Sequence, residues 1–295
     1  MNQQLQDLIA LLDLERLELD LFRGQSRDLG GKSVYGGQVI GQALVAAGRT
    51  VQDSVPHSLH AYFLRPGDMA QPIVYEVDRV RDGRSFTARR VQALQNGAAI
   101  LSMIASFQRP EPGLEHQAPM PSVPPPEALE FLHVQRARWA DAAPGLHPRL
   151  RDALCRELAI EFKAVTPWNP LEPEKRAPAQ AYWIRAAGRL PDLPDGTPDW
   201  TLHRCVLAYA SDFNFLSTAM LPHGRSWFAR DMVVASIDHA LWFHRDARID
   251  DWLLYSMESP SAQGARGFSR GLIHDRAGRL VASVTQESLM RSTAL

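Results

Sequence analysis

Four polar or ionisable side chains interrupt an apolar stretch that runs from Val233 to Arg245 near the C-terminus; they are Ser236, Asp238, His239 and His244. The stretch lacks Gly and Pro and begins with β-branched residues, which predicts a buried strand. Burying such side chains is costly unless each one finds a partner. The strand therefore borders either a reactive site or a satisfied polar network between a sheet and a helix, and both interpretations stay open.

An Asp beside a His could serve as an acid–base pair. Adjacent residues of a strand point to opposite faces, however, so Asp238 and His239 cannot readily act on one substrate. The same alternation places Ser236 on the face of Asp238 and away from His239.

Two short motifs suggest chemistry that their context does not support. Gly267–Gly271 has the Gly-x-Ser-x-Gly spacing of a serine-hydrolase nucleophile elbow, with Ser269 at its centre. That elbow joins a strand to a helix, whereas this segment continues as a strand toward a turn. Gly30-Gly31-Lys32-Ser33 resembles the end of a phosphate-binding loop, but that motif requires a glycine at position 26, which is Ser. We therefore expect neither a serine nucleophile nor a phosphate loop.

Composition and charge exclude several classes of protein. The 295 residues are 45% hydrophobic and 22% charged, as in an ordinary globular chain. The net charge of -1 gives no basic field for nucleic acid or an anionic membrane, and no apolar run has the length of a membrane span. Cys155 and Cys205 form neither a disulfide framework nor a metal motif. We expect a cytoplasmic protein without metal, nucleic acid or membrane partners.

The apolar pattern predicts two similar groups of elements. The first has helices at 3–12 and 39–47 and strands at 17–21, 57–65, 72–81, 85–94 and 98–108, with a two-residue hairpin turn at Asn96-Gly97. The second has a helix at 203–216 and strands at 181–185, 236–245, 251–258, 267–274 and 280–290. Between them, prolines from 109 to 126 indicate an extended linker, followed by helices at 127–140 and 148–158.

Corresponding residues of the two groups are separated by a nearly constant offset. Ser58 and Ser236 are 178 residues apart, Phe86 and Phe268 are 182 apart, and Gly97 and Gly278 are 181 apart. This indicates one unit present twice, a long helix cradled by a curved antiparallel sheet. We expect an α+β fold with an N-terminal repeat at 1–110, a Pro-rich linker with helices at 111–165 and a C-terminal repeat at 166–295, joined by their sheet edges.

A set of motifs from residue 35 to residue 287 resembles the acyl-CoA thioesterase II family, the double-hotdog thioesterases. The motifs are Tyr35-Gly-Gly-Gln38, Ser58 to Gly67, Ala210-Ser-Asp-Phe213, Ser236-Ile-Asp-His239, Trp242 to Arg245, Ser261 to Phe268 and Ser283 to Glu287. The resemblance implies a double-hotdog fold and cofactor-free hydrolysis of fatty acyl-CoA to fatty acid and CoA. Matched motif by motif, the family's catalytic Asp, Thr or Ser, and Gln fall on Asp212, Ser236 and Gln286.

These three residue types suit the hydrolysis of a thioester by water. Asp212 can take a proton from water as a general base. The Ser236 hydroxyl can donate and accept, so it can hold that water beside the carboxylate, and the Gln286 amide can orient it without a change of charge. Many members of the family have Thr where this chain has Ser236, but either residue supplies the hydroxyl.

The first repeat is expected to be catalytically silent, because its helix carries no carboxylate. It is instead expected to contribute substrate-binding residues to the acyl or pantetheine channel: Tyr35, Gly36, Gly37 and His60. For His60 a purely structural role is the stronger interpretation.

Two other functions stay open at this point. One is a hotdog hydratase acting on enoyl-CoA through an acid–base pair, and the other is a sensor that binds acyl-CoA without turnover. The resemblance also implies a homo-oligomer, a dimer or a tetramer, formed in addition to the pairing of the two repeats within one chain.

Overall fold

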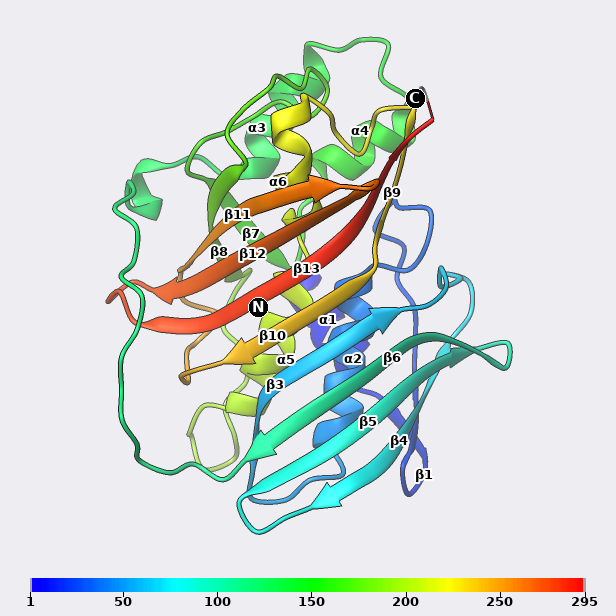
Figure 1. Ribbon diagram of the computed structural model, residues 1–295, viewed down its shortest axis with the longest axis vertical. Helices are drawn as coiled ribbons and strands as arrows, with labels where there is room; N and C mark the ends of the chain where they lie inside the picture. The colour runs from blue at the N-terminus through cyan, green and yellow to red at the C-terminus, as the bar shows by residue number, and fades with distance from the viewer. Residues whose placement is uncertain (1, 294–295) are drawn as a thin grey trace.

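A single antiparallel sheet of 13 strands organises the molecule in the computed structural model, which describes residues 2–293 (Figure 1). Its strand order is β1-β2-β4-β5-β6-β3-β10-β13-β12-β11-β8-β7, and β9 pairs with β13 off this path. The strands of each half of the chain stay together in this order. The sheet is therefore two repeats joined side by side.

The N-terminal repeat wraps a sheet around one long buried helix. Its elements are α1 (Gln3–Leu12), β1 (Glu15–Glu18), β2 (Leu21–Gly24), α2 (Gly36–Gly48), β3 (Val55–Phe63), β4 (Ile73–Asp82), β5 (Phe86–Gln95) and β6 (Ala98–Gln108). Small residues dominate α2, which lets the sheet approach it closely. Asn96 and Gly97 both have positive φ, 50° and 74°, as the tight turn between β5 and β6 requires.

The middle of the chain is a long extended segment followed by short helices. Residues 109–125 run along one side of the molecule (Figure 1) and lead into η1 (Pro126–Ala128), α3 (Leu132–Asp141) and α4 (Pro148–Cys155). The segment is fixed to the second repeat, because the Gln117 side chain donates to the Gly278 carbonyl at 2.7 Å. Its Met120 and Val123 also pack against the buried side chains of Trp183, Trp252 and Leu254 in the second repeat.

The C-terminal repeat has the same plan with a broken helix. Its elements are β7 (Ile160–Ala164), β8 (Ala179–Ala186), α5 (Trp200–Ser211), α6 (Phe215–Met220), η2 (Leu221–His223), β9 (Met232–Ser236), β10 (Asp238–Phe243), β11 (Leu253–Gln263), β12 (Arg266–Asp275) and β13 (Leu280–Ser292). The helices α5 and α6 occupy the place that α2 has in the first repeat.

The repeats join through both the sheet and the helices. Strands β3 and β10 pair antiparallel, with Leu59 opposite Leu241 and His60 opposite Ala240. On the concave side α2 lies against α5, and a Cβ at Gly41 would stand 3.3 Å from the Cys205 carbonyl oxygen. The main core contains residues of both repeats, and a second, smaller cluster contains Trp183, Trp252 and Leu254. This arrangement confirms the α+β class and the double repeat.

Several sequence expectations were wrong in detail. The strand expected at 17–21 spans the turn between β1 and β2, and the helix expected at 127–140 begins only at Leu132, after the short η1. The helix expected at 203–216 ends at Ser211 and resumes at Phe215, because Asn214 adopts a left-handed conformation with φ 61°. The sheet of the second repeat begins at Ile160, before the expected boundary at 166. The strand expected at 236–245 is two strands, β9 and β10, that meet at Ile237.

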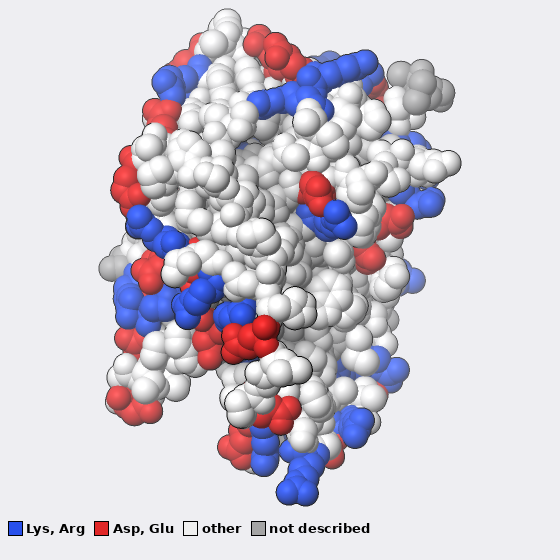
Figure 2. Space-filling view, turned by 60° about the vertical axis from the view of Figure 1, so that its left-hand side comes forward, with Lys and Arg blue, Asp and Glu red and all other residues white. Residues whose placement is uncertain are grey.

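The surface has a mixed distribution of charge. On the face shown in Figure 2, acidic and basic side chains are interspersed and no extended region carries a single sign. This agrees with the net charge of -1. Within residues 2–293, no helix is both long enough and apolar enough to cross a membrane.

Candidate active site between the two repeats

Asp212 lies where the helix of the second repeat breaks. It is the C-terminal cap of α5, and the left-handed Asn214 turns the chain before α6 begins. The carboxylate Oδ2 accepts a hydrogen bond of 2.9 Å from the backbone N–H of Gly37, in the first turn of α2. The positive end of one repeat's helix therefore faces the carboxylate at the end of the other repeat's helix.

Gly36 and Gly37 are needed here for their lack of a side chain. A Cβ at Gly36 would stand 2.7 Å from the Asp212 Oδ2 atom, and a Cβ at Gly37 would stand 2.3 Å from the Tyr209 carbonyl oxygen. Both distances are shorter than real Cβ contacts, so the two glycines allow α2 to approach Asp212. Tyr35 precedes them and donates its hydroxyl to the same Tyr209 carbonyl at 3.0 Å.

Ser236 reaches the same place because of a β-bulge. Ser236 pairs with Ser288, whereas Ala240 pairs with Thr285, so four steps along β9 and β10 match three along β13. The extra residue lies at the junction of β9 and β10, opposite Glu287. There the backbone N–H of Ile237 donates to the Glu287 carbonyl, and the Asp238 carboxylate accepts from the Glu287 backbone N–H. A bulge reverses the alternation of side chains. Ser236 and His239 therefore share a face, contrary to the expectation from a regular strand.

Gln286 connects these side chains. Its Nε2 atom donates to the Ser236 Oγ at 3.0 Å and to the Ser288 Oγ at 3.1 Å. The Ser236 hydroxyl in turn donates to the Asp212 Oδ1 at 3.4 Å, a long hydrogen bond. Asp212, Ser236 and Gln286 thus form one chain of hydrogen bonds through the single hydroxyl of Ser236.

His239 completes the chain on its buried side. It is 0% exposed, its Nδ1 lies 2.7 Å from the Gln286 Oε1, and its Nε2 lies 2.8 Å from the Ser211 Oγ. The Gln286 carbonyl oxygen can only accept, so Nδ1 carries the proton. A satisfied polar network, one of the two interpretations of this stretch, therefore lies directly beneath the candidate site. The signal in the sequence was a histidine in an apolar strand, without an indication of its partner.

Burial shifts the ionisation of both titratable groups. Burial raises the pKa of the Asp212 carboxyl above 3.8, although the His239 ring and the hydrogen bonds from Gly37, Ser236 and Gln286 act in the opposite direction. Burial lowers the pKa of His239 below 6.5. The arrangement therefore favours the neutral form of His239 and makes the ionised form of Asp212 a stronger base than an exposed aspartate.

The remaining expected residues lie elsewhere. His60 is exposed, and its ring packs against Trp242 at 5.0 Å. It alternates with the buried Leu59 and Ala61, so it lies on the opposite face of the sheet from the site. The structure does not bring His60 to Asp212, which favours the structural role.

The Ser269 motif lacks the required context. Ser269 lies within β12, which leads into a hairpin and β13, and no helix follows it up to residue 293. Asp238, the acid of the hydratase alternative, accepts a 2.6 Å hydrogen bond from the Glu287 backbone.

Among residues 2–293, no group of three or more His, Cys, Asp or Glu side chains is arranged to hold a metal ion.

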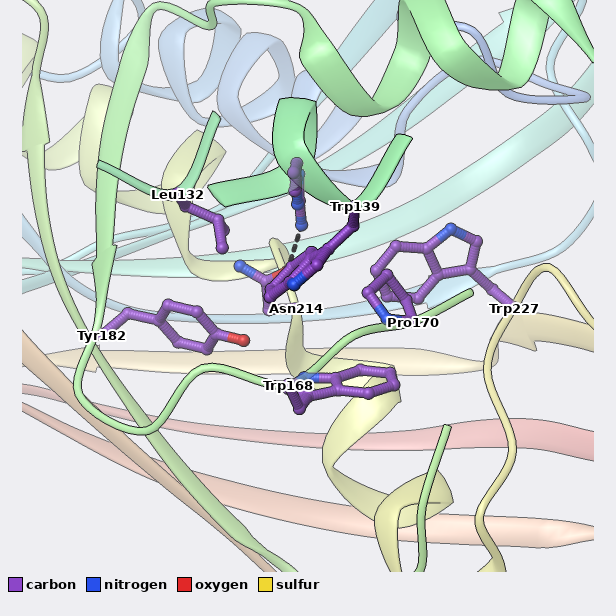
Figure 3. Close-up of a pocket in the computed structure, with 8 residues that line it drawn as sticks. Leu132, Trp139, Trp168, Pro170, Tyr182, Asn214 and Trp227 are labelled. Carbon is purple, nitrogen blue, oxygen red and sulfur yellow. Dashed lines mark hydrogen bonds between the residues drawn. The ribbon is translucent and has the colours of Figure 1, made fainter. Parts of the chain in front are cut away.

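A small aromatic pocket lies beyond the helix break, two residues from Asp212. Its lining includes the rings of Trp139, Trp168, Tyr182 and Trp227, together with the Asn214 side chain (Figure 3). Its volume of about 10 Å³ holds no more than one water molecule. This pocket therefore shapes the surroundings of the helix break but leaves no room for a substrate in the present conformation.

Comparisons with known proteins identify the family. A family model described as acyl-CoA thioesterase matches residues 158–289, and one described as acyl-CoA thioesterase N-terminal domain matches residues 25–108. The chain is 42% identical to acyl-coenzyme A thioesterase 8 of Homo sapiens, over 96% of this chain and 88% of the relative. This chain belongs to the acyl-CoA thioesterase family.

Other relatives align with this thioesterase over almost its full length. The chain is 40% identical to acyl-CoA thioesterase 2 of Haemophilus influenzae, over 99% of both chains. A crystal structure of an acyl-CoA thioesterase II from Mycobacterium marinum superposes with a TM-score of 0.75 and 39% identity, over 97% of each chain. Both halves of the double hotdog are therefore matched.

Proposed function

We propose that this protein hydrolyses fatty acyl-CoA thioesters to fatty acid and CoA with a water held by Asp212, Ser236 and Gln286. The observation that carries the proposal is the Ser236 hydroxyl, which lies 3.4 Å from the Asp212 carboxylate and 3.0 Å from the Gln286 amide. These groups come from a helix end, a bulged strand and the neighbouring strand. Nothing in the packing of the core requires such a convergence of polar groups.

The reaction would begin with the transfer of a proton from the water to Asp212 while the water oxygen attacks the thioester carbon. Ser236 and Gln286 would hold the water in line with the thioester carbon. This removes the entropic cost of bringing the water and the thioester together in the right orientation. The positive end of α2 lies beside Asp212, because its Gly37 N–H donates to that carboxylate, and it would stabilise the negative charge that develops nearby on the carbonyl oxygen. The carbon–sulfur bond then breaks, and the CoA sulfur takes up the proton from Asp212.

His239 would act as a positioning residue. Through Nδ1 it fixes the Gln286 carbonyl oxygen, and this keeps the amide nitrogen directed at Ser236. A neutral imidazole suits this role, because Nδ1 donates to the Gln286 carbonyl oxygen while Nε2 is held 2.8 Å from the Ser211 Oγ. The first repeat would contribute no acid or base, since α2 contains no carboxylate.

Incubation with a fatty acyl-CoA and a thiol reagent tests the reaction directly. Release of free thiol at a rate that depends on Asp212 supports hydrolysis. Loss of the absorbance of an enoyl-CoA without thiol release would indicate a hydratase, and binding without either change would indicate a sensor. A series of acyl-CoA substrates of increasing length, measured in the same assay, gives the preferred chain length.

We also propose that the protein is a cytoplasmic homo-oligomer, a dimer or a tetramer. Free cysteines support the compartment: Cys205 is buried with its pKa raised to about 12, and Cys155 is also unpaired. A double hotdog in one chain already mimics a dimer of single repeats, so further association would use the outer surfaces. Light scattering that reports only a mass near 32.9 kDa would contradict the oligomer.

A further inference from the structure

A second, larger hollow lies at the far end of the strands that carry the site. It measures about 560 Å³ and lies between the end of α6 and η2, the ends of β9 and β13, and the hairpin between β11 and β12. A volume of this size accommodates a small organic ligand. We call it the basic groove; its lining is Met220, His223, Arg225, Met232, Ala262, Gln263, Ala265, Arg266, Met290, Arg291 and Ser292.

The basic groove combines an apolar floor with cationic side chains. Three methionines, Met220, Met232 and Met290, line it, and their flexible thioethers pack well against a flat aromatic ring. None of its lining residues is Asp or Glu, whereas three are Arg and one is His. The groove therefore suits a ligand that has both an aromatic ring and negative charge.

Not all of this positive charge is neutralised by neighbours. Arg225 pairs with Asp231 at 3.1 Å, and Arg266 pairs with Glu287 at 2.8 Å. Arg291 is exposed, and its guanidinium forms no ion pair or hydrogen bond with any residue between 2 and 293. It remains free to bind an anion, and the two paired arginines are held in place beside it.

The basic groove lies on the same face of the sheet as the candidate site. Met290 is four residues beyond Gln286 on β13, and Met232 is four residues before Ser236 on β9, so the even spacing keeps all four side chains on one face. At roughly 3.3 Å per residue, about 13 Å separates the two places along the strands. The Ser236–Ser288 and Val234–Met290 pairs show that β9 and β13 stay in register over this distance.

We propose that the basic groove binds the nucleotide end of coenzyme A. The phosphates would contact the arginines, with Arg291 as the main contact, and the adenine ring would lie on the methionines. The pantetheine arm would follow the face of β9 and β13 and present the thioester to Asp212. A fatty acyl chain is a poorer occupant, because it would remove the arginines from water without supplying a negative charge. The assignment rests on the proposed hydrolysis of acyl-CoA.

The test compares two substrates that carry the same acyl group, one on CoA and one on pantetheine, which lacks the nucleotide. For Arg291→Ala and Arg291→Glu, we expect KM for acyl-CoA to rise by about tenfold or more. A tenfold rise corresponds to ~1.4 kcal/mol of lost binding free energy, as expected for the loss of a charge-assisted contact. We expect kcat to change less than twofold and KM for acyl-pantetheine to stay the same. Added salt should raise KM of the parent enzyme for acyl-CoA more than that of the variants.

Arg279→Ala is the matched control. Arg279 is also a surface arginine, but it pairs with Asp275 and lies just before the opposite end of β13. It should leave both KM values unchanged. An equal rise of KM for both substrates in the Arg291 variants would show that the groove holds the acyl chain, and no change for either would place the nucleotide elsewhere; both results overturn the assignment. A parent enzyme that hydrolyses neither substrate would instead contradict the proposed function.

Discussion

His239 Nδ1 lies 2.7 Å from Gln286 Oε1 beneath the candidate site, and this contact sets the direction of the Gln286 amide. His239→Ala should reduce kcat by about 10–100-fold, because a displaced amide misplaces the attacking water. KM should stay close to the parent value, since His239 contacts no substrate. His239→Asn keeps a donor at the position of Nδ1 and should recover much of kcat.

The comparison of these two His239 variants separates positioning from folding. Both remove the ring, so both lose buried contacts, and thermal unfolding should show a loss of stability in each. If His239→Asn were as inactive as His239→Ala while both stayed folded, the contact with Gln286 would have no role in positioning.

Asp212 should be the residue with the largest effect on turnover. Asp212→Asn removes the base and keeps the shape, so kcat should fall by about 10²–10⁴-fold. Substrate binding should survive, which equilibrium binding of a non-hydrolysable acyl-CoA analogue can show. Activity within a few-fold of the parent would exclude Asp212 as the base.

Stability should depend on pH through the same carboxyl group. Burial raises the pKa of Asp212 in the folded protein above its ordinary value of 3.8. The folded state therefore disfavours the charged form, and this penalty appears as the pH rises through the raised pKa. Thermal unfolding at pH 7 should show Asp212→Asn to be more stable than the parent, and the difference should disappear at a pH below 3.8, where the carboxyl is protonated in both states.

The acid limb of the activity profile should report the same shift. Activity requires the carboxylate, so kcat should fall as the pH decreases through the raised pKa of Asp212. The midpoint should lie above 3.8, the ordinary value for an aspartate. A profile that stays flat down to that pH, in protein that remains folded, would contradict a buried base.

Ser236 and Gln286 should act as a unit with Asp212. Ser236→Thr keeps the hydroxyl and should be tolerated, whereas Ser236→Ala and Gln286→Ala should lower kcat strongly. Combining Asp212→Asn with Gln286→Ala should cost less than the product of the single losses, because both residues serve one water. Fully multiplicative losses would mean that they act at separate places.

Gly37 should tolerate no side chain. The Gly37→Ala methyl group would stand 2.3 Å from the Tyr209 carbonyl oxygen and would push α2 away from Asp212. We expect a loss of most activity together with a lower melting temperature. Gly97→Ala provides a contrast: Gly97 has no heavy atom within 4 Å of the added Cβ and lies in a remote turn, so it should lose stability through its positive φ but keep its turnover per folded molecule.

Much of the fold follows from local patterns in the sequence. The alternation of apolar residues in β4, β5 and β6, the Asn96-Gly97 turn and the small residues of α2 each depend on neighbours in the chain, so they can be recognised without the tertiary structure. The constant offset between Phe86 and Phe268 likewise shows the repeat. The identities of Asp212, Ser236 and Gln286 came from motif resemblance, and their residue types show only that they can bind and deprotonate water.

The tertiary structure decided how those residues meet. The bulge at Ile237 reverses the side chains between Ser236 and His239, and a bulge depends on pairing with a distant strand, β13, which no local pattern reveals. The break after Ser211 depends in the same way on contacts with the other repeat, since Gly37 N–H holds the Asp212 carboxylate across 175 positions of the chain. Sequence determines which chemical groups are present, whereas the distance between groups far apart in the chain is fixed only when the two repeats pack against each other.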